Sequence, residues 1–217
     1  MVRLLDVHRG ILFTTNLKVL YSTLVHHDHL TRLNESQVAA RYLSGRLEKH
    51  IMFARNPYDR LVSAWTDKFA SHPNRLGGAD FGRWQDIQYL YLRRLGVSRE
   101  APDAVIQSEL LGVGFDEFVR YLPDVYLRDG HLVPQWMAKS IRLRGRWAVL
   151  PLRIDQVIRI EEMDRAKILA ELGVDLNGNH LNRTDHPPAA HLFTPELQAI
   201  VDVLYKQDFR EFGYARL

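Results

Sequence analysis

Continuous apolar runs alternate along the chain with segments of helical periodicity. Two segments, residues 10–15 and 50–54, are typical of strands buried on both faces, and residues 157–160 are a third strand candidate. Helical spacing follows from about residue 19, from residue 57 and over residues 164–172, and further helices are predicted over 35–47, 84–95, 115–122 and 195–209. Strand-then-helix units in succession predict an α/β fold, a doubly wound parallel sheet flanked by helices.

The pattern predicts one domain spanning residues 1–217. No internal repeat, low-complexity tract or Pro/Gly/Ser-rich linker divides the sequence. With 217 residues, 46% of them hydrophobic, the chain is long enough to bury a sizeable core.

The composition indicates which kind of partner and which cellular compartment to expect. There are no cysteines, which excludes disulfides and thiolate–metal sites, and charged residues interrupt the N-terminal apolar stretch. We therefore expect a cytoplasmic chain without a transmembrane segment. The 29 Lys and Arg against 26 Asp and Glu give a net charge of +3, which favours local basic sites for a small anion over a nucleic-acid-binding surface.

Basic and hydroxyl residues occupy both of the first two junctions between a strand and a helix. The first junction reads TTNLKVLYST and contains Lys18, Ser22 and Thr23; the second, FARNPYDRLVSAWTDKF, contains Arg55 and Ser63. Ligands of open parallel sheets bind at the carboxyl ends of the strands, where helix N-termini present N–H groups to anions. The sequence thus predicts an anion site at this edge.

Two alternatives compete at these junctions. Asn56, Pro57 and Asp59 could form an ordinary capped helix start, with Arg55 in a surface salt bridge. A P-loop-type kinase would need a glycine-rich loop and a magnesium-binding carboxylate; no glycine occurs between Gly10 and Gly45, and no carboxylate lies near the loop. Spacing alone does not decide between an anion site and a capped helix.

Several spaced motifs resemble the carbohydrate sulfotransferases, especially the membrane-bound chondroitin and dermatan group. The stretch FARNPYDRLVSAWTDKF resembles that family's 3'-phosphate-binding segment, and NLKVLYST resembles its 5'-phosphosulfate loop. FDEFVRYL, HLVPQ, VIRIEEMD and YKQDFREFGY resemble further family segments in the same order, so the resemblance spans residues 10–214. Leu17, Leu20 and Tyr21 depart from the loop's proline and small residues. The chain looks like a compact bacterial relative with a P-loop-like fold.

The resemblance implies transfer of a sulfuryl group from 3'-phosphoadenosine 5'-phosphosulfate (PAPS) to a hydroxyl, leaving the 3',5'-bisphosphate (PAP), with no metal. By the resemblance, Lys18 stabilises the departing nucleotide and Ser22 and Thr23 bind the 5'-phosphate. Arg55 and Ser63 would bind the 3'-phosphate. Arg183, in a late loop, is a further candidate for the nucleotide.

The acceptor hydroxyl needs a general base, which a neutral imidazole can supply. His26 and His27, in the cluster VHHDHL, and His131, in HLVPQ, are the candidates. The expected acceptor is a carbohydrate or glycolipid whose identity the sequence does not specify, and nothing indicates the oligomeric state. A degenerate domain that binds a glycan or partner without turnover remains the alternative, because of the altered loop.

Overall fold

The computed structural model describes residues 1–70, 84–142, 149–176 and 188–217. Contacts divide the chain into two compact units. The first comprises Met1–Asn56, Gln135–Arg183 and Arg210–Tyr214, and the second comprises Pro57–Pro134, Thr184–Phe209 and Ala215–Leu217. Both units are built from segments that are separate in the sequence.

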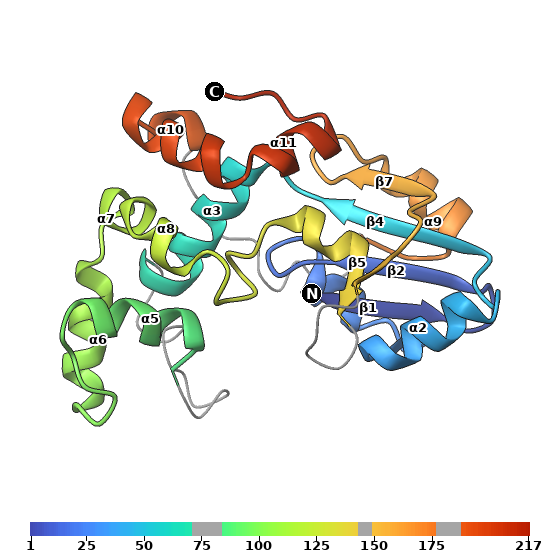
Figure 1. Ribbon diagram of the computed structural model, residues 1–217, viewed down its shortest axis with the longest axis horizontal. Coiled ribbons are helices and arrows are strands. Elements are labelled where there is room, and N and C mark those ends of the chain that lie inside the picture. Colours follow the sequence, from blue (N-terminus) through green and yellow to red (C-terminus); the bar gives the residue numbers. More distant parts are fainter. Residues whose placement is uncertain (71–83, 143–148, 177–187) are drawn as a thin grey trace. The chain divides into compact units, whose positions relative to one another are not determined.

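A five-stranded mixed sheet forms the centre of the first unit (Figure 1). Its strand order is β3-β1-β2-β4-β7, with β2, β4 and β7 parallel and β1 antiparallel to both of its neighbours. The prediction of a parallel sheet is therefore correct for three strands and wrong for β1. The bounds are β1 Val2–Asp6, β2 Ile11–Thr15, β3 Leu30–Arg32, β4 Lys49–Ala54 and β7 Gln156–Arg159.

A tight turn explains why β1 is antiparallel. The Asp6 carboxylate accepts hydrogen bonds from the main-chain N–H groups of His8 and Arg9, at 3.0 and 3.1 Å. Gly10 then takes a φ of 65°, which glycine adopts at no steric cost. Because only the four residues 7–10 join β1 to β2, the two strands must form a hairpin.

Helices cover both faces of the sheet, as predicted. On one face, α1 (Tyr21–Val25) and α9 (Arg165–Leu172) pack on the stacked rings of Phe13 and Phe53. The other face is covered by α2 (Glu35–Leu43), the 3₁₀ turn η2 (Gln135–Lys139) and the hairpin of β5 (Ser140–Arg142) and β6 (Val149–Pro151). The sheet is therefore buried on both sides, which explains its continuous apolar runs.

The second unit is helical and has an aromatic core. The Tyr91 ring lies 4.7 Å from that of Phe69 and 5.3 Å from that of Phe118, and its hydroxyl donates to the Phe118 carbonyl at 2.7 Å. The predicted helix over 195–209 is broken at Tyr205. The elements are α3 Pro57–Trp65, the π-helix η1 Thr66–Ala70, α5 Asp86–Arg94, α6 Asp103–Gly112, α7 Phe115–Arg120, α8 Leu122–Val125, η3 Ala189–His191 and α10 Pro195–Leu204; α11 Lys206–Phe212 continues into the first unit.

Candidate functional site

The two predicted anion-binding junctions lie side by side at one edge of the sheet. Thr14 of β2 pairs with Met52 of β4, and continuing this parallel register sets residue 17 opposite residue 55. The Arg55 guanidinium donates through Nη1 to the main-chain carbonyl of Lys18, at 3.1 Å. The structure thus brings Lys18 and Arg55 together at the carboxyl ends of adjacent strands, where ligands of such sheets bind.

The loop between β2 and α1 has an unusual backbone. Lys18 has a φ of 67° and Leu20 a φ of 55°, both in the left-handed region that disfavours side chains with a Cβ. Thr15 stabilises this shape, because its hydroxyl donates to the Val19 carbonyl. Leu20 stands where the resembled loop has glycine or alanine, so this chain adopts the loop shape despite a costly residue. Ser22 and Thr23 follow in α1, both half-buried.

A buried amide at the base of the loop has an unmet donor. Asn16 is only 1% exposed, and its Nδ2 has no hydrogen-bond partner among the described residues. An unsatisfied buried donor costs about 1–3 kcal/mol, and native structures contain few of them. Such a donor beside Lys18 fits a loop that binds an acceptor-rich group such as a phosphate.

The main chain of Arg55 is clamped by one side chain. Gln135 accepts from the Arg55 N–H through Oε1 at 2.9 Å and donates to the Arg55 carbonyl through Nε2 at 2.7 Å. Gln135 is 0% exposed, whereas Arg55 is half-buried. Sequence reasoning quoted Gln135 within HLVPQ but assigned it no role, because its partner lies 80 residues away.

Glu161 and Tyr214 support the next residue of the junction. The Glu161 carboxylate accepts from the Asn56 N–H at 2.7 Å and from the Tyr214 hydroxyl at 2.9 Å. Burial, and then the negative charge of Glu161, raises the pKa of Tyr214, so its hydroxyl stays protonated and remains a donor. Both residues lie in segments quoted for the resemblance, VIRIEEMD and YKQDFREFGY, which therefore meet at this junction.

Ser63 and Arg183 are the other two predicted nucleotide-binding residues beyond the two junction segments of the first unit. Ser63 belongs to the second unit, where it is 5% exposed on α3. Arg183 lies outside the described residues. Their predicted roles remain predictions.

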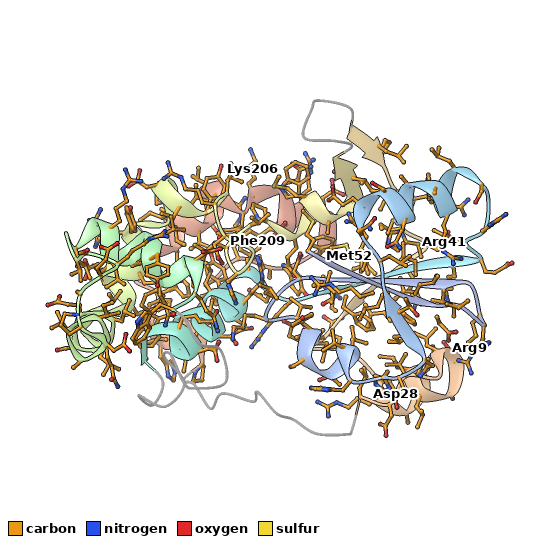
Figure 2. The ribbon with its side chains drawn as sticks, turned by 90° about the horizontal axis from the view of Figure 1, so that it is seen from below. Arg9, Asp28, Arg41, Met52, Lys206 and Phe209 are labelled. Atoms are coloured by element: carbon orange, nitrogen blue, oxygen red, sulfur yellow. The ribbon has the colours of Figure 1, made fainter. Side chains whose placement is uncertain are left out.

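The cluster VHHDHL lies at the opposite edge of the sheet from Lys18. Its last residue, Leu30, is the first residue of β3 and pairs with Asp6 beside the start of β2. Figure 2 shows Asp28, from this cluster, at the same end of the sheet as Arg9 of the β1–β2 turn. The four residue steps of β2 span about 13 Å.

The two histidines of that cluster named as candidate bases are not brought together with Lys18. His26 is exposed, and the His27 ring donates through Nε2 to the Asp175 carbonyl at 2.9 Å.

His131 forms a pair with a carboxylate inside the second unit. Its Nδ1 and its main-chain N–H both lie 2.7 Å from Oδ1 of Asp129, which is 9% exposed. Burial alone would raise the pKa of Asp129, but the hydrogen bonds from His131 outweigh it, and the pKa lies below the usual value. An ionised Asp129 accepts the hydrogen bond from Nδ1, so in a neutral ring the proton lies on Nδ1 and the lone pair lies on Nε2.

Two cavities among the described residues have linings that do not include the two basic residues of the junctions. One, of about 390 Å³, lies between β7 and α9, and the other, of about 210 Å³, is lined by residues around His50; neither is lined by Lys18 or Arg55. Within the described ranges, no group of three or more His, Asp and Glu side chains could hold a metal ion. In the same residues, no helix is long and apolar enough to cross a membrane.

Comparisons with known proteins agree with the motif order. The sulfotransferase family matches residues 14–215 of the chain. Carbohydrate sulfotransferase 8 of Mus musculus and of Homo sapiens are each 42% identical over 76 residues, which is 35% of this chain and 16% of theirs. Carbohydrate sulfotransferase 10 of Danio rerio is 34% identical over 106 residues, 45% of this chain and 26% of the relative. The matches therefore cover between 16% and 26% of the length of these relatives, and no solved structure matches.

Proposed function

The chain belongs to the sulfotransferase family, and on that premise we propose that it moves a sulfuryl group from PAPS to a hydroxyl of a carbohydrate or glycoconjugate. The observation that carries the proposal is the bond from the Arg55 guanidinium to the Lys18 carbonyl. It places side by side the two strand tips whose basic residues the resemblance assigns to the two ends of one nucleotide. PAPS is the donor in this proposal, and PAP is the product.

The residues at the strand tips fit a doubly anionic nucleotide. Arg55 carries a planar guanidinium that can bind a phosphate bidentately, and its fixed main chain preorganises it for the 3'-phosphate. At the other tip, Asn16 Nδ2 has no hydrogen-bond partner among the described residues. We assign it, together with Lys18 and the hydroxyls of Ser22 and Thr23, to the 5'-phosphate. Ser63 is proposed for the 3'-phosphate on the resemblance alone.

In the reaction, the acceptor oxygen bonds to sulfur as the bond between sulfur and the phosphate oxygen breaks. The acceptor proton passes to a base, and PAP leaves with the bonding electron pair. Negative charge develops on that phosphate oxygen, and a cation positioned there lowers the barrier. We assign this role to Lys18.

We propose His131 as the general base. The carboxylate of Asp129 directs the proton to Nδ1 and leaves Nε2 able to accept one from a hydroxyl. Among the three candidate histidines it is the one with such an orienting carboxylate, whereas His26 and His27 lie beyond the far end of β2 from Lys18.

A carbohydrate acceptor is supported by the names of the relatives, carbohydrate sulfotransferases 8 and 10. A specific observation also favours a binding domain without turnover. Leu20 holds a left-handed conformation at the position of a small loop residue, and Tyr21 follows it, so bulky side chains stand where a phosphosulfate would approach the backbone.

Two measurements test the proposal. Titration calorimetry with PAP should show binding, and labelled sulfate from PAPS should be transferred to at least one member of a glycan panel. The variant K18A should lower transfer by about 10²–10³-fold, with unchanged unfolding. K49A, which removes a lysine at the amino end of β4, is the matched control and should transfer normally. Glycan binding without PAP binding would favour the binding domain and refute the enzyme.

A further inference from the structure

The carboxamide of Gln135, which bonds the main chain of Arg55, lies where a neighbouring strand would otherwise pair with Arg55. Consecutive strand residues direct their main-chain groups to opposite neighbours, and the Ala54 carbonyl and the Asn56 N–H face β7 and its following residues. The main-chain groups of Arg55 therefore face the side of β2. β2 ends at Thr15, so the chain has already turned into the lysine loop where it would have paired with Arg55.

The carboxamide of Gln135 supplies that missing pairing. It makes one donor and one acceptor contact, at 2.7 and 2.9 Å, which is the pair of bonds that a neighbouring strand would provide. Without it, the half-buried N–H and carbonyl of Arg55 at the strand tip would lose both of these bonds. Gln135 thus lets β2 leave the sheet while β4 stays extended for one more residue.

This extra extended residue sets the direction of the Arg55 side chain. Side chains alternate across a strand, so Arg55 projects on the same face as Ile51 and Phe53, which is the face that α1 covers. On that face its guanidinium reaches the Lys18 carbonyl. If residue 55 left the extended conformation, the guanidinium would lose both its direction and its bond to the loop.

We propose that Gln135 is a positioning residue for the anion site, and that it acts through Arg55 on binding of the nucleotide's 3'-phosphate. The inference rests on the proposed function, because it takes PAP and PAPS as the ligands. Gln135 does not touch the reacting atoms. Its loss should therefore raise the KM for PAPS and the Kd for PAP and change kcat little.

The variant Q135M removes both bonds and keeps the length of the side chain. The matched control is Q88M in the second unit, because Gln88 is 1% exposed and also bonds two main-chain groups, the Gln85 N–H at 2.8 Å and the Lys68 carbonyl at 3.0 Å. Both variants should lose comparable stability in urea. Calorimetry is run where both are folded; if Q135M does not fold, Q135E, which keeps one acceptor, replaces it.

The deciding experiment is a double-mutant cycle of Q135M and R55A, read as the Kd for PAP. Q135M should weaken PAP binding about ten-fold in the wild-type background, as lost orienting contacts do at ligand sites, and less than two-fold in the R55A background. Q88M should leave the Kd unchanged. Equal weakening in both backgrounds, or none in the wild type, would overturn the positioning role. Failure of the wild type itself to bind PAP would instead overturn the proposed function, and this inference with it.

Discussion

Acidification should destabilise this protein through His50, a histidine 2% exposed on β4. Its Nδ1 donates to the Arg153 carbonyl at 3.1 Å, so Nε2 accepts from the Thr14 hydroxyl at 2.8 Å and the ring is neutral. Burial lowers the pKa of His50 from 6.5 to about 4. Between these two values the unfolded chain binds a proton at residue 50 and the folded chain does not, so the free energy of unfolding falls as the pH falls.

The magnitude follows from the two pKa values. At about 1.36 kcal/mol per pH unit, the full loss below pH 4 is about 3.4 kcal/mol, and about 2 kcal/mol of it is already lost at pH 5. This is a large share of the 5–15 kcal/mol typical of a folded protein. Carboxylates also titrate in this range, so the effect must be isolated by comparing variants.

Urea unfolding of the wild type and H50Q at pH 7.5 and pH 5.0 provides that comparison. H50Q should be less stable than the wild type at pH 7.5 but should lose about 2 kcal/mol less on acidification. The control H26Q, which removes an exposed histidine, should follow the wild type. If H50Q loses as much stability as the wild type between the two pH values, the buried neutral histidine is not the cause and the reasoning fails.

Three further predictions concern the loop, the second unit and the base. L20G and L47G each remove a half-buried leucine, but of these two residues only Leu20 has a left-handed backbone. L20G should therefore lower the free energy of unfolding in urea by about 1–2 kcal/mol less than L47G does. Equal losses would show that the backbone of Leu20 is not strained. R60M should destabilise by about 3–5 kcal/mol, because the guanidinium is 1% exposed and its loss takes a positive charge away from the buried carboxylates of Asp208 and Asp129. A neutral effect in thermal or urea unfolding would show that apolar packing suffices there. D129N should lower kcat for sulfate transfer by about 10³–10⁴-fold and leave the Kd for PAP unchanged, because the amide no longer holds the proton of His131 on Nδ1. Normal turnover across the pH profile would show that Asp129 and His131 take no part in the reaction.

Local patterns were sufficient to predict the central strands and several helix ends. The apolar runs before Thr15 and Arg55 are β2 and β4, and the helix predicted to stop at Gly173 does so, with that residue at a φ of 68°. These features depend on neighbouring residues alone. A run buried on both faces needs no polar position, and a left-handed helix end needs a glycine.

β1 was missed because a charged residue, the second of the strand, is buried. Arg3 is 3% exposed, and its guanidinium donates to the carbonyls of Ala138 and Ser140, at 3.3 and 2.8 Å, and lies 3.6 Å from the Glu35 carboxylate. Burial lowers the pKa of Arg3, while Glu35 raises it in part. The partners that make this burial tolerable come from elements distant in the sequence, so no local pattern reveals them.

The residues of the candidate site also fall into two groups, those that a local pattern predicts and those that only the folded structure reveals. Lys18 and Arg55 were found because each lies where a predicted strand becomes a helix, which is a local signal. Gln135 and Glu161 act on main-chain groups 80 and 105 residues away, and only the three-dimensional arrangement shows this. The signal that could have found them was the presence of both residues in the quoted motifs.

The discontinuity of the first unit has a consequence during translation. Phe212, 5% exposed, packs with Met52, Ala54 and Ala138 in one hydrophobic cluster, although it follows the last residue of β4 by 158 positions (212 − 54). A ribosome releases the amino end first, so β4 is synthesised long before the residue that completes its cover. Until then Met52 lacks part of its packing, and the nascent chain presents an apolar surface that chaperones bind. A message truncated before codon 210 would yield a chain that retains every predicted catalytic and nucleotide-binding residue and still cannot close this cluster.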